Sequence, residues 1–191
     1  MTLVTFFVIF QTNKIKIQMN ESNKKAELGW VMFDWANSSY SLVISTAIFP
    51  TFFIAVTDAY IPVFGLNISN SSIYAFSVSI AYLMICLISP ILSGIADYSG
   101  SRKLFMRLFT TTGSAACAAL FFFDGMNHIW LGVLAFIIAT SSHAGSLVFY
   151  DAFLPELVPP NRRDKLSARG YAYGYIGSVI LLIINIIVIQ K

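Results

Sequence analysis

Five long apolar runs are the feature that most constrains the fold of this chain. Each is about 20 residues or longer, the length that a helix needs to cross the hydrocarbon core of a bilayer. Charged residues make up only 11% of the chain, whereas soluble domains carry about 25%. The sequence therefore predicts an all-α membrane protein with five transmembrane helices. Their expected ranges are 32–56, 73–96, 104–123, 128–150 and 170–190.

The positive charges predict how these helices are oriented. Eleven of the twelve Lys and Arg residues lie in three places: before the first run, around the junction of the second and third runs, and around the junction of the fourth and fifth runs. The segments 57–72 and 124–127, which join the other runs, hold neither Lys nor Arg. Because cytoplasmic loops are enriched in Lys and Arg, we expect an integral, multi-pass protein with a cytoplasmic N-terminus.

A short polar turn joins the second and third runs. Asp97 ends one predicted helix, and Arg102 and Lys103 start the next. Gly100 lies between them and can adopt the left-handed conformation that a tight turn requires. An anion at a helix C-terminus and cations at a helix N-terminus both oppose the helix dipoles. We therefore expect these charges to contact partners beyond their own helix ends.

The same turn carries a family resemblance. Its order of residues is similar to the loop signature between the second and third helices of the major facilitator superfamily. The corresponding positions are Ser93, Asp97, Gly100, Arg102 and Lys103. Two positions depart: the family usually has glycine where this chain has Ser93, and a cation where it has Tyr98. Three further stretches resemble the branch that contains the fungal vacuolar amino-acid effluxers and their bacterial relatives. They are FDWANSSY (33–40), FYDAFLPEL (149–157) and SARGYAYGY (167–175).

This resemblance implies the fold and the activity of a secondary transporter. Major facilitator proteins have two six-helix halves, with the substrate site between them, and work by alternating access. Residues 29–191 would then form a truncated N-terminal bundle that lacks the sixth helix, and the missing C-terminal half would be its partner. The solute would be small, and amino-acid efflux is what the resemblance suggests. The alternative is a membrane fragment or assembly partner that does not transport.

The resemblance also implies a role for the turn and a location for the protein. Asp97, Gly100, Arg102 and Lys103 would form a conformational gate that holds the two halves together in one state; the alternative is a plain cytoplasmic hairpin. The membrane would be the cell (inner) membrane in a bacterium and the vacuolar membrane in a fungus. Residues 1–28 are expected to form a polar tail, in which residues 1–18 are candidates for a segment upstream of the natural start at Met19.

Polar side chains follow one face of the first run. Their spacing of three or four residues places them on one side of an α-helix. They are Asp34, Asn37, Ser38, Ser41 and Ser45. Because lipid cannot satisfy these groups, we expect the face to line a cavity or to contact protein. Two alternatives stay open: hydrogen bonding between helices, and capping of the helix N-terminus by Asp34.

The fourth run carries a second polar face formed by His143, Ser146 and Tyr150, with Asp151 adjacent. A histidine inside a membrane can relay protons, because its ordinary pKa is about 6.5. The alternative is a neutral, hydrogen-bonding histidine. The family resemblance implies that both polar faces line the same central cavity.

Small residues and missing motifs complete the sequence evidence. The fifth run has a face of Gly170, Gly174 and Gly177, which favours close packing against another helix. We find no glycine-rich phosphate loop and no Cys/His cluster of the kind that binds zinc. The sequence therefore predicts no enzyme activity, no metal and no cofactor, and partners limited to lipid, solute and the second half.

Overall fold

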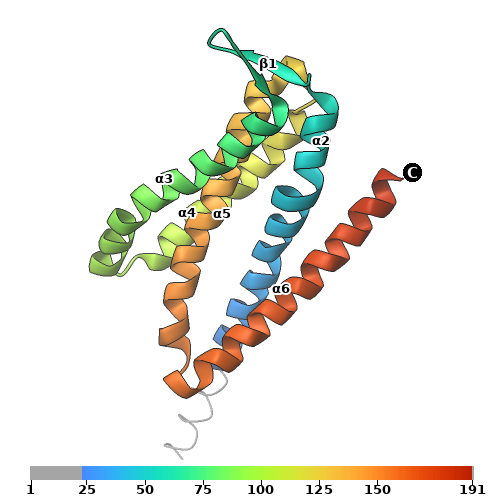
Figure 1. Ribbon diagram of the computed structural model, residues 1–191. Helices are drawn as coiled ribbons and strands as arrows, with labels where there is room; N and C mark the ends of the chain where they lie inside the picture. The colour runs from blue at the N-terminus through green and yellow to red at the C-terminus, as the bar shows by residue number, and fades with distance from the viewer. Residues whose placement is uncertain (1–22, 191) are drawn as a thin grey trace, which may run out of the picture.

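The computed structural model describes residues 23–190 (Figure 1). Five helices in this part of the chain are long and apolar enough to cross a membrane, which confirms the all-α membrane fold. The first helix (Asn23–Val56) contains a π-helical segment, η1 (Tyr40–Ile48), and ends as α2 (Phe49–Val56). The other long helices are α3 (Asn70–Ser99), α4 (Arg102–Ala119), α5 (Ile129–Leu157) and α6 (Pro160–Ile189). The 3-10 turns η2 (Leu120–Phe122) and η3 (Met126–His128) connect α4 to α5.

The first helix, α5 and α6 extend by about two turns or more beyond the apolar runs that predict them. The first helix is already formed at Asn23 rather than at residue 32, so residues 23–28 of the expected tail are helical; residues 1–22, with Met19, lie outside the described part. α5 continues to Leu157, and α6 begins at Pro160 rather than at residue 170. Hydropathy detects only the part of a helix that is apolar, whereas these helices continue as polar turns beyond it.

A proline is expected to stop a helix, but Pro155 lies inside α5, two residues before the end. A proline removes one backbone hydrogen bond. So close to the helix end this loss affects only the final turn, and the helix ends at Leu157 instead.

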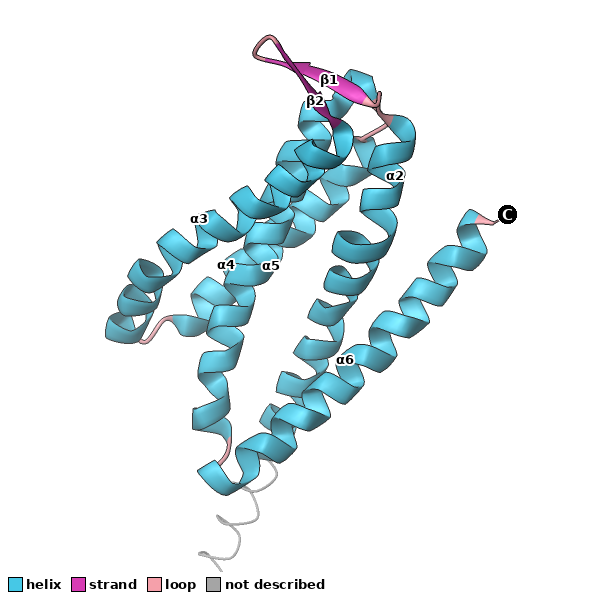
Figure 2. Cartoon of the chain, in the orientation of Figure 1, coloured by secondary structure: helices cyan, strands magenta, loops and turns pink. Residues whose placement is uncertain are grey.

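The segment expected as a loop between the first two runs contains a β-hairpin. Strands β1 (Tyr60–Val63) and β2 (Leu66–Ser69) pair antiparallel, with Val63 opposite Leu66 (Figure 2). The two turn residues, Phe64 and Gly65, both have positive φ. Such a two-residue turn matches the right-handed twist of paired strands.

α5 is the central helix of the bundle, and α3 and α4 pack against it. Two of its glycines allow close approach: a Cβ at Gly132 would lie 2.5 Å from Phe123, and one at Gly145 would lie 2.6 Å from Phe109. The first helix lies between α5 and α6 in Figure 1. Side chains rather than close backbone contact bridge the first helix and α5, which leaves room for a cavity between them.

The bundle has two chemically different ends. The start of the first helix, the turn between α3 and α4 and the turn between α5 and α6 lie toward the lower end in Figure 1, and the hairpin lies at the opposite end. The lower end, which we call the cationic end, holds every described Lys and Arg. These are Lys24, Lys25, Arg102, Lys103, Arg107, Arg162, Arg163, Lys165 and Arg169.

Candidate functional site

A polar cavity of about 240 Å³ lies between the first helix, α5 and the first half of α6. Four of the five residues of the first polar face line it, together with His143 and Tyr150. The full lining is Trp30, Asp34, Asn37, Ser38, Ser41, His143, Leu147, Tyr150, Asp151, Ser167 and Tyr171. Residues predicted from the spacing on two separate helices therefore line one space, which we call the polar cavity.

Asp34 is the buried carboxylate of this cavity, with 7% of its surface exposed. The hydroxyl of Ser38 donates to its Oδ1 at 3.4 Å. The alternative that Asp34 caps the helix N-terminus is wrong, because the helix already begins at Asn23. At 1.5 Å per residue, Asp34 lies about 16 Å along the helix from Asn23. Asp34 also lies within the expected apolar run 32–56, and a carboxylate in a membrane helix usually faces a bundle interior or a cavity.

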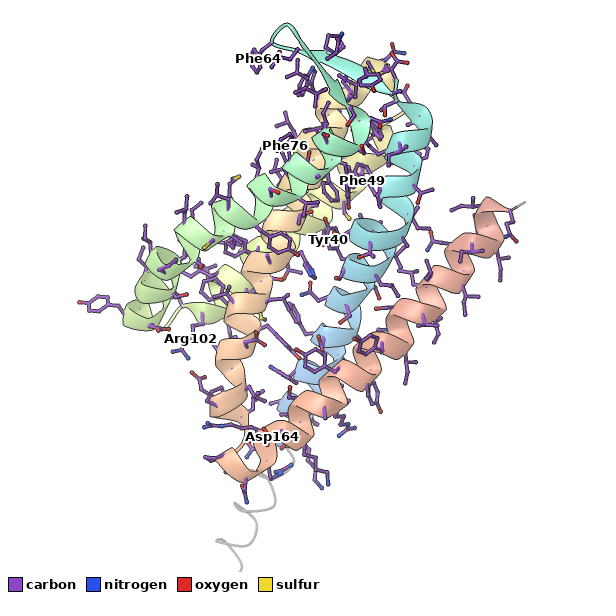
Figure 3. The ribbon with its side chains drawn as sticks, viewed as in Figure 1. Tyr40, Phe49, Phe64, Phe76, Arg102 and Asp164 are labelled. Atoms are coloured by element: carbon purple, nitrogen blue, oxygen red, sulfur yellow. The ribbon has the colours of Figure 1, made fainter. Side chains whose placement is uncertain are left out.

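Asn37 and His143 join the first helix to α5 across the cavity. Nδ1 of His143 lies 3.1 Å from Oδ1 of Asn37. The ring of Tyr40 lies 4.9 Å from the imidazole, and its hydroxyl is 2.7 Å from the hydroxyl of Thr140. Figure 3 shows Tyr40 between these two helices. His143 thus makes a hydrogen bond between helices, as the alternative of a hydrogen-bonding histidine requires.

Two buried polar groups of the cavity use none of their hydrogen-bonding capacity within the described residues. They are Nδ2 of Asn37 and the hydroxyl of Tyr150. A buried polar group without a partner costs free energy, so such groups ordinarily bind water or a ligand. Both residues line the polar cavity, and an occupant with acceptor atoms would satisfy them.

Ser45 does not line the polar cavity, and the reason is the π-helical segment. In η1 the hydrogen bonds run from residue i to i+5, which widens each turn. The hydroxyl of Thr46 accordingly donates to the carbonyl of Ser41, five residues back, at 2.8 Å. Thr46, not Ser45, lines the next cavity toward α6, which measures about 260 Å³. The α-helical spacing that predicts Ser45 does not hold beyond Tyr40.

Ser146 also lies away from the polar cavity. Its hydroxyl donates to the carbonyl of His143 at 2.7 Å. It lines a separate cavity of about 220 Å³ between the first helix, α4 and α5. Asn37 and His143 line both spaces and so form the wall between them.

The turn around Gly100 is held by an ion-pair network. Gly100 has a left-handed backbone with φ of 64°. Nε of Arg102 donates to Oδ1 of Asp97 at 2.6 Å, and its Nη1 pairs with Glu156 near the end of α5. Figure 3 places Arg102 at this turn. One cation therefore ties α3, α4 and α5 together, and Lys103 faces a neighbouring groove instead.

Sequence reasoning missed Glu156 as the partner of Arg102, and it also missed a second ion pair. Glu27 is buried and accepts two hydrogen bonds from Nη2 of Arg162, at 3.2 and 3.0 Å. This pair joins the start of the first helix to the start of α6. The sequence feature that could have predicted both pairs is the excess of Lys and Arg at these turns, because such cations need carboxylate partners from other parts of the chain.

The three glycines of α6 face the first helix. A Cβ at Gly170 would lie 2.8 Å from Trp30 and 2.9 Å from Asp34. A Cβ at Gly174 would lie 2.5 Å from Ser38, and a Cβ at Gly177 would overlap the ring of Trp35. This close approach is what brings Ser167 and Tyr171 to the polar cavity.

The polar cavity offers carboxylates, hydroxyls, an amide and an imidazole from three helices. No group of three or more His, Cys, Asp or Glu residues able to hold a metal occurs among the described residues.

Comparison with known proteins places the chain in a family. Residues 22–162 match the family described as "Vacuole effluxer Atg22 like". The chain is 39% identical over 165 residues to an uncharacterized MFS-type transporter, YxiO, of Bacillus subtilis. It is 28% identical over 130 residues to autophagy-related protein 22-1 of Phaeosphaeria nodorum. No solved structure matches the chain.

These matches cover much of the chain but little of the relatives. The match to the Bacillus protein takes in 86% of this chain and 38% of that relative. The match to the Phaeosphaeria protein takes in 51% of this chain and 23% of that relative. The helices, the motifs and the matched residues agree: the chain belongs to the Atg22-like vacuole effluxer family of major facilitator-type transporters.

Proposed function

We propose that this chain is the N-terminal part of a secondary transporter that moves a small solute by alternating access. The observation that carries the proposal is the polar cavity, in which Asn37 and Tyr150 present unused hydrogen-bonding groups. A polar cavity between membrane helices, lined by a buried carboxylate, is typical of a solute pathway. Family membership supports the same conclusion.

Amino acids are the proposed solute class. Asp34 and Asp151 both line the polar cavity and would attract the ammonium group of an amino acid. Asn37 and the hydroxyl of Tyr150 would donate hydrogen bonds to its carboxylate. His143 connects the two helices at the centre of this arrangement, where it either orients Asn37 or accepts a proton from the solution.

A second bundle is part of the proposal. Transporters of this type place the substrate between two bundles that rock against one another, and the Bacillus relative is longer than the part that matches this chain. The network of Asp97, Arg102 and Glu156 would gate this motion at the cationic end, with Gly100 as the turn and Lys103 beside it. By the positive-inside rule, we propose that this end and the N-terminus are cytoplasmic.

The test uses a chimera in which this chain replaces the matching part of the Bacillus subtilis relative. We expect accumulated radiolabelled amino acids to leave cells that express the chimera faster than cells without it. Asp34→Asn should reduce this efflux at least ten-fold, because it removes the buried charge with little change in shape. Asp58→Asn, outside the polar cavity, is the matched control. Unchanged efflux in the Asp34→Asn chimera would contradict a role of the polar cavity in transport.

The alternative function is a membrane protein that assembles with others and does not itself transport. The exposed apolar residues of the last half of α6, such as Val179, Ile183 and Ile187, favour it, because they offer a surface for another helix as readily as for lipid. The chimera separates the two functions, because amino-acid efflux no faster than in cells without it would favour the assembly role. Saturable, gradient-driven flux from liposomes that contain only residues 1–191 would exclude the need for a second bundle.

A further inference from the structure

A groove of about 500 Å³ lies outside the polar cavity, between the first helix, α4 and α5. Trp30 and Tyr150 line both spaces, and their rings stack with centroids 4.3 Å apart. The stacked rings therefore separate the groove from the polar cavity. We call this space the cationic groove.

The cationic groove has an apolar wall and a charged end. Phe33, Met106, Phe153 and Leu157 form much of the wall. Lys103 and Arg107 also line it, and they lie four residues apart on one face of α4. The space therefore suits a molecule with both an apolar part and an anionic part.

The two cations of the groove are available to an anion. Among the described residues, Asp97 and Glu156 pair with Arg102, and no carboxylate pairs with Lys103 or Arg107. Lys103 lies in the first turn of α4, where the helix dipole adds positive potential, and Arg107 lies one turn further along. Arg107 is only about 8 Å along the helix axis from Arg102, so both cations lie close to the end of α4, where the headgroups of a bilayer are expected.

We propose that the cationic groove binds one anionic phospholipid. Its phosphate would lie between Lys103 and Arg107, and an acyl chain would pack along Phe33, Met106 and Phe153. Basic pockets between membrane helices, at the ends of the helices, are suited to acidic headgroups. A soluble anion would leave the apolar wall exposed, and a zwitterionic lipid would bring a positive choline group to two cations. The groove lies on the other side of the stacked rings of Trp30 and Tyr150 from the polar cavity, and lipid binding there can be tested without transport.

The test is native mass spectrometry of the full 191-residue chain in detergent, with dioleoylphosphatidylglycerol and dioleoylphosphatidylcholine in competition. We expect the anionic lipid to be retained preferentially. Lys103→Gln/Arg107→Gln should reduce this preference by roughly five-fold for each charge, hence about 25-fold together. Thermal unfolding without lipid would establish that the variant is folded.

Two further variants separate the groove from general charge and from folding. Lys165→Gln/Arg169→Gln removes the same charge from the cationic end, outside the groove, and should leave the preference unchanged. Met106→Trp keeps both charges but fills the groove, and should reduce retention of the anionic lipid. Equal retention of the two lipids would overturn the proposal. So would a loss of preference in the Lys165→Gln/Arg169→Gln variant as large as that in the Lys103→Gln/Arg107→Gln variant; the groove would then be a candidate surface for a protein helix.

Discussion

At the scale of single residues, Gly170 decides how closely α6 approaches the first helix. An added Cβ would lie 2.8 Å from Trp30, 2.9 Å from Asp34 and 3.3 Å from Tyr150, and all three are buried. We therefore expect Gly170→Ala to lower the free energy of unfolding by about 1–2 kcal/mol, because overpacking outweighs the gain in helix propensity. Thermal unfolding in detergent would measure it.

Gly94→Ala is the matched control for this substitution. Gly94 lies inside α3, and an added Cβ there would meet nothing within 4 Å. Alanine should therefore be neutral or slightly stabilising at this position. Equal losses of stability for Gly94→Ala and Gly170→Ala would show that the close approach of α6 is not what makes Gly170 necessary.

The hydroxyl pair of Tyr40 and Thr140 gives a second prediction for individual residues. The two oxygens are 2.7 Å apart, and Thr140 is only 1% exposed. Tyr40→Phe leaves the threonine hydroxyl without this partner and should cost about 1 kcal/mol of unfolding free energy. Because removing both partners is nearly neutral, Tyr40→Phe/Thr140→Val should be more stable than Tyr40→Phe. A double mutant that is less stable than either single mutant contradicts this account.

At the scale of elements, Arg102 links the turn between α3 and α4 to the end of α5. The backbone amide of Ser101 donates to the carbonyl of Ala96 at 3.0 Å, so the turn has amides whose exchange can be measured. Glu156→Gln should speed deuterium exchange over residues 99–105 by up to about five-fold, because an exposed ion pair contributes little more. Mass spectrometry of the corresponding peptide would measure the change.

The control for this experiment lies at the opposite end of the bundle. Asp124 contacts His128 at 2.7 Å, and Asp124→Asn removes an exposed carboxylate there. It should leave exchange over residues 99–105 unchanged. If Glu156→Gln also leaves that exchange unchanged, the pair with Arg102 does not restrain the turn and cannot serve as its gate.

At the scale of the whole molecule, the hairpin and the cationic end lie at opposite ends of the bundle (Figure 1), and we propose that they lie on opposite sides of the membrane. Phe64, at the hairpin tip, is fully exposed, and Ser101 lies in the turn at the cationic end. In a background without Cys86 and Cys117, we expect Phe64→Cys to react with a membrane-impermeant maleimide in intact cells, and Ser101→Cys to react only after lysis. Labelling of Ser101→Cys from outside would reverse the proposed orientation.

The sequence by itself determined the number of helices, the end that carries the positive charge and the family. Each follows from a local property: the length of an apolar run, the position of Lys and Arg, or the order of residues in a short motif. Helical spacing also predicted that Asp34, Asn37, Ser38 and Ser41 share one face and that His143 and Tyr150 share another, and the six line one cavity; Ser45 and Ser146 do not line it.

Only the tertiary structure decided which residues meet. Glu156 reaches Arg102 across 54 positions of the chain, and Asn37 reaches His143 across 106. Spacing along one helix carries no information about a partner on another, because the partner depends on how the helices cross. Thr46 rather than Ser45 faces α6 because the first helix is π-helical there. Where a π-helical segment begins depends on hydrogen bonds formed in the packed bundle, and the spacing of polar residues in the sequence does not reveal it.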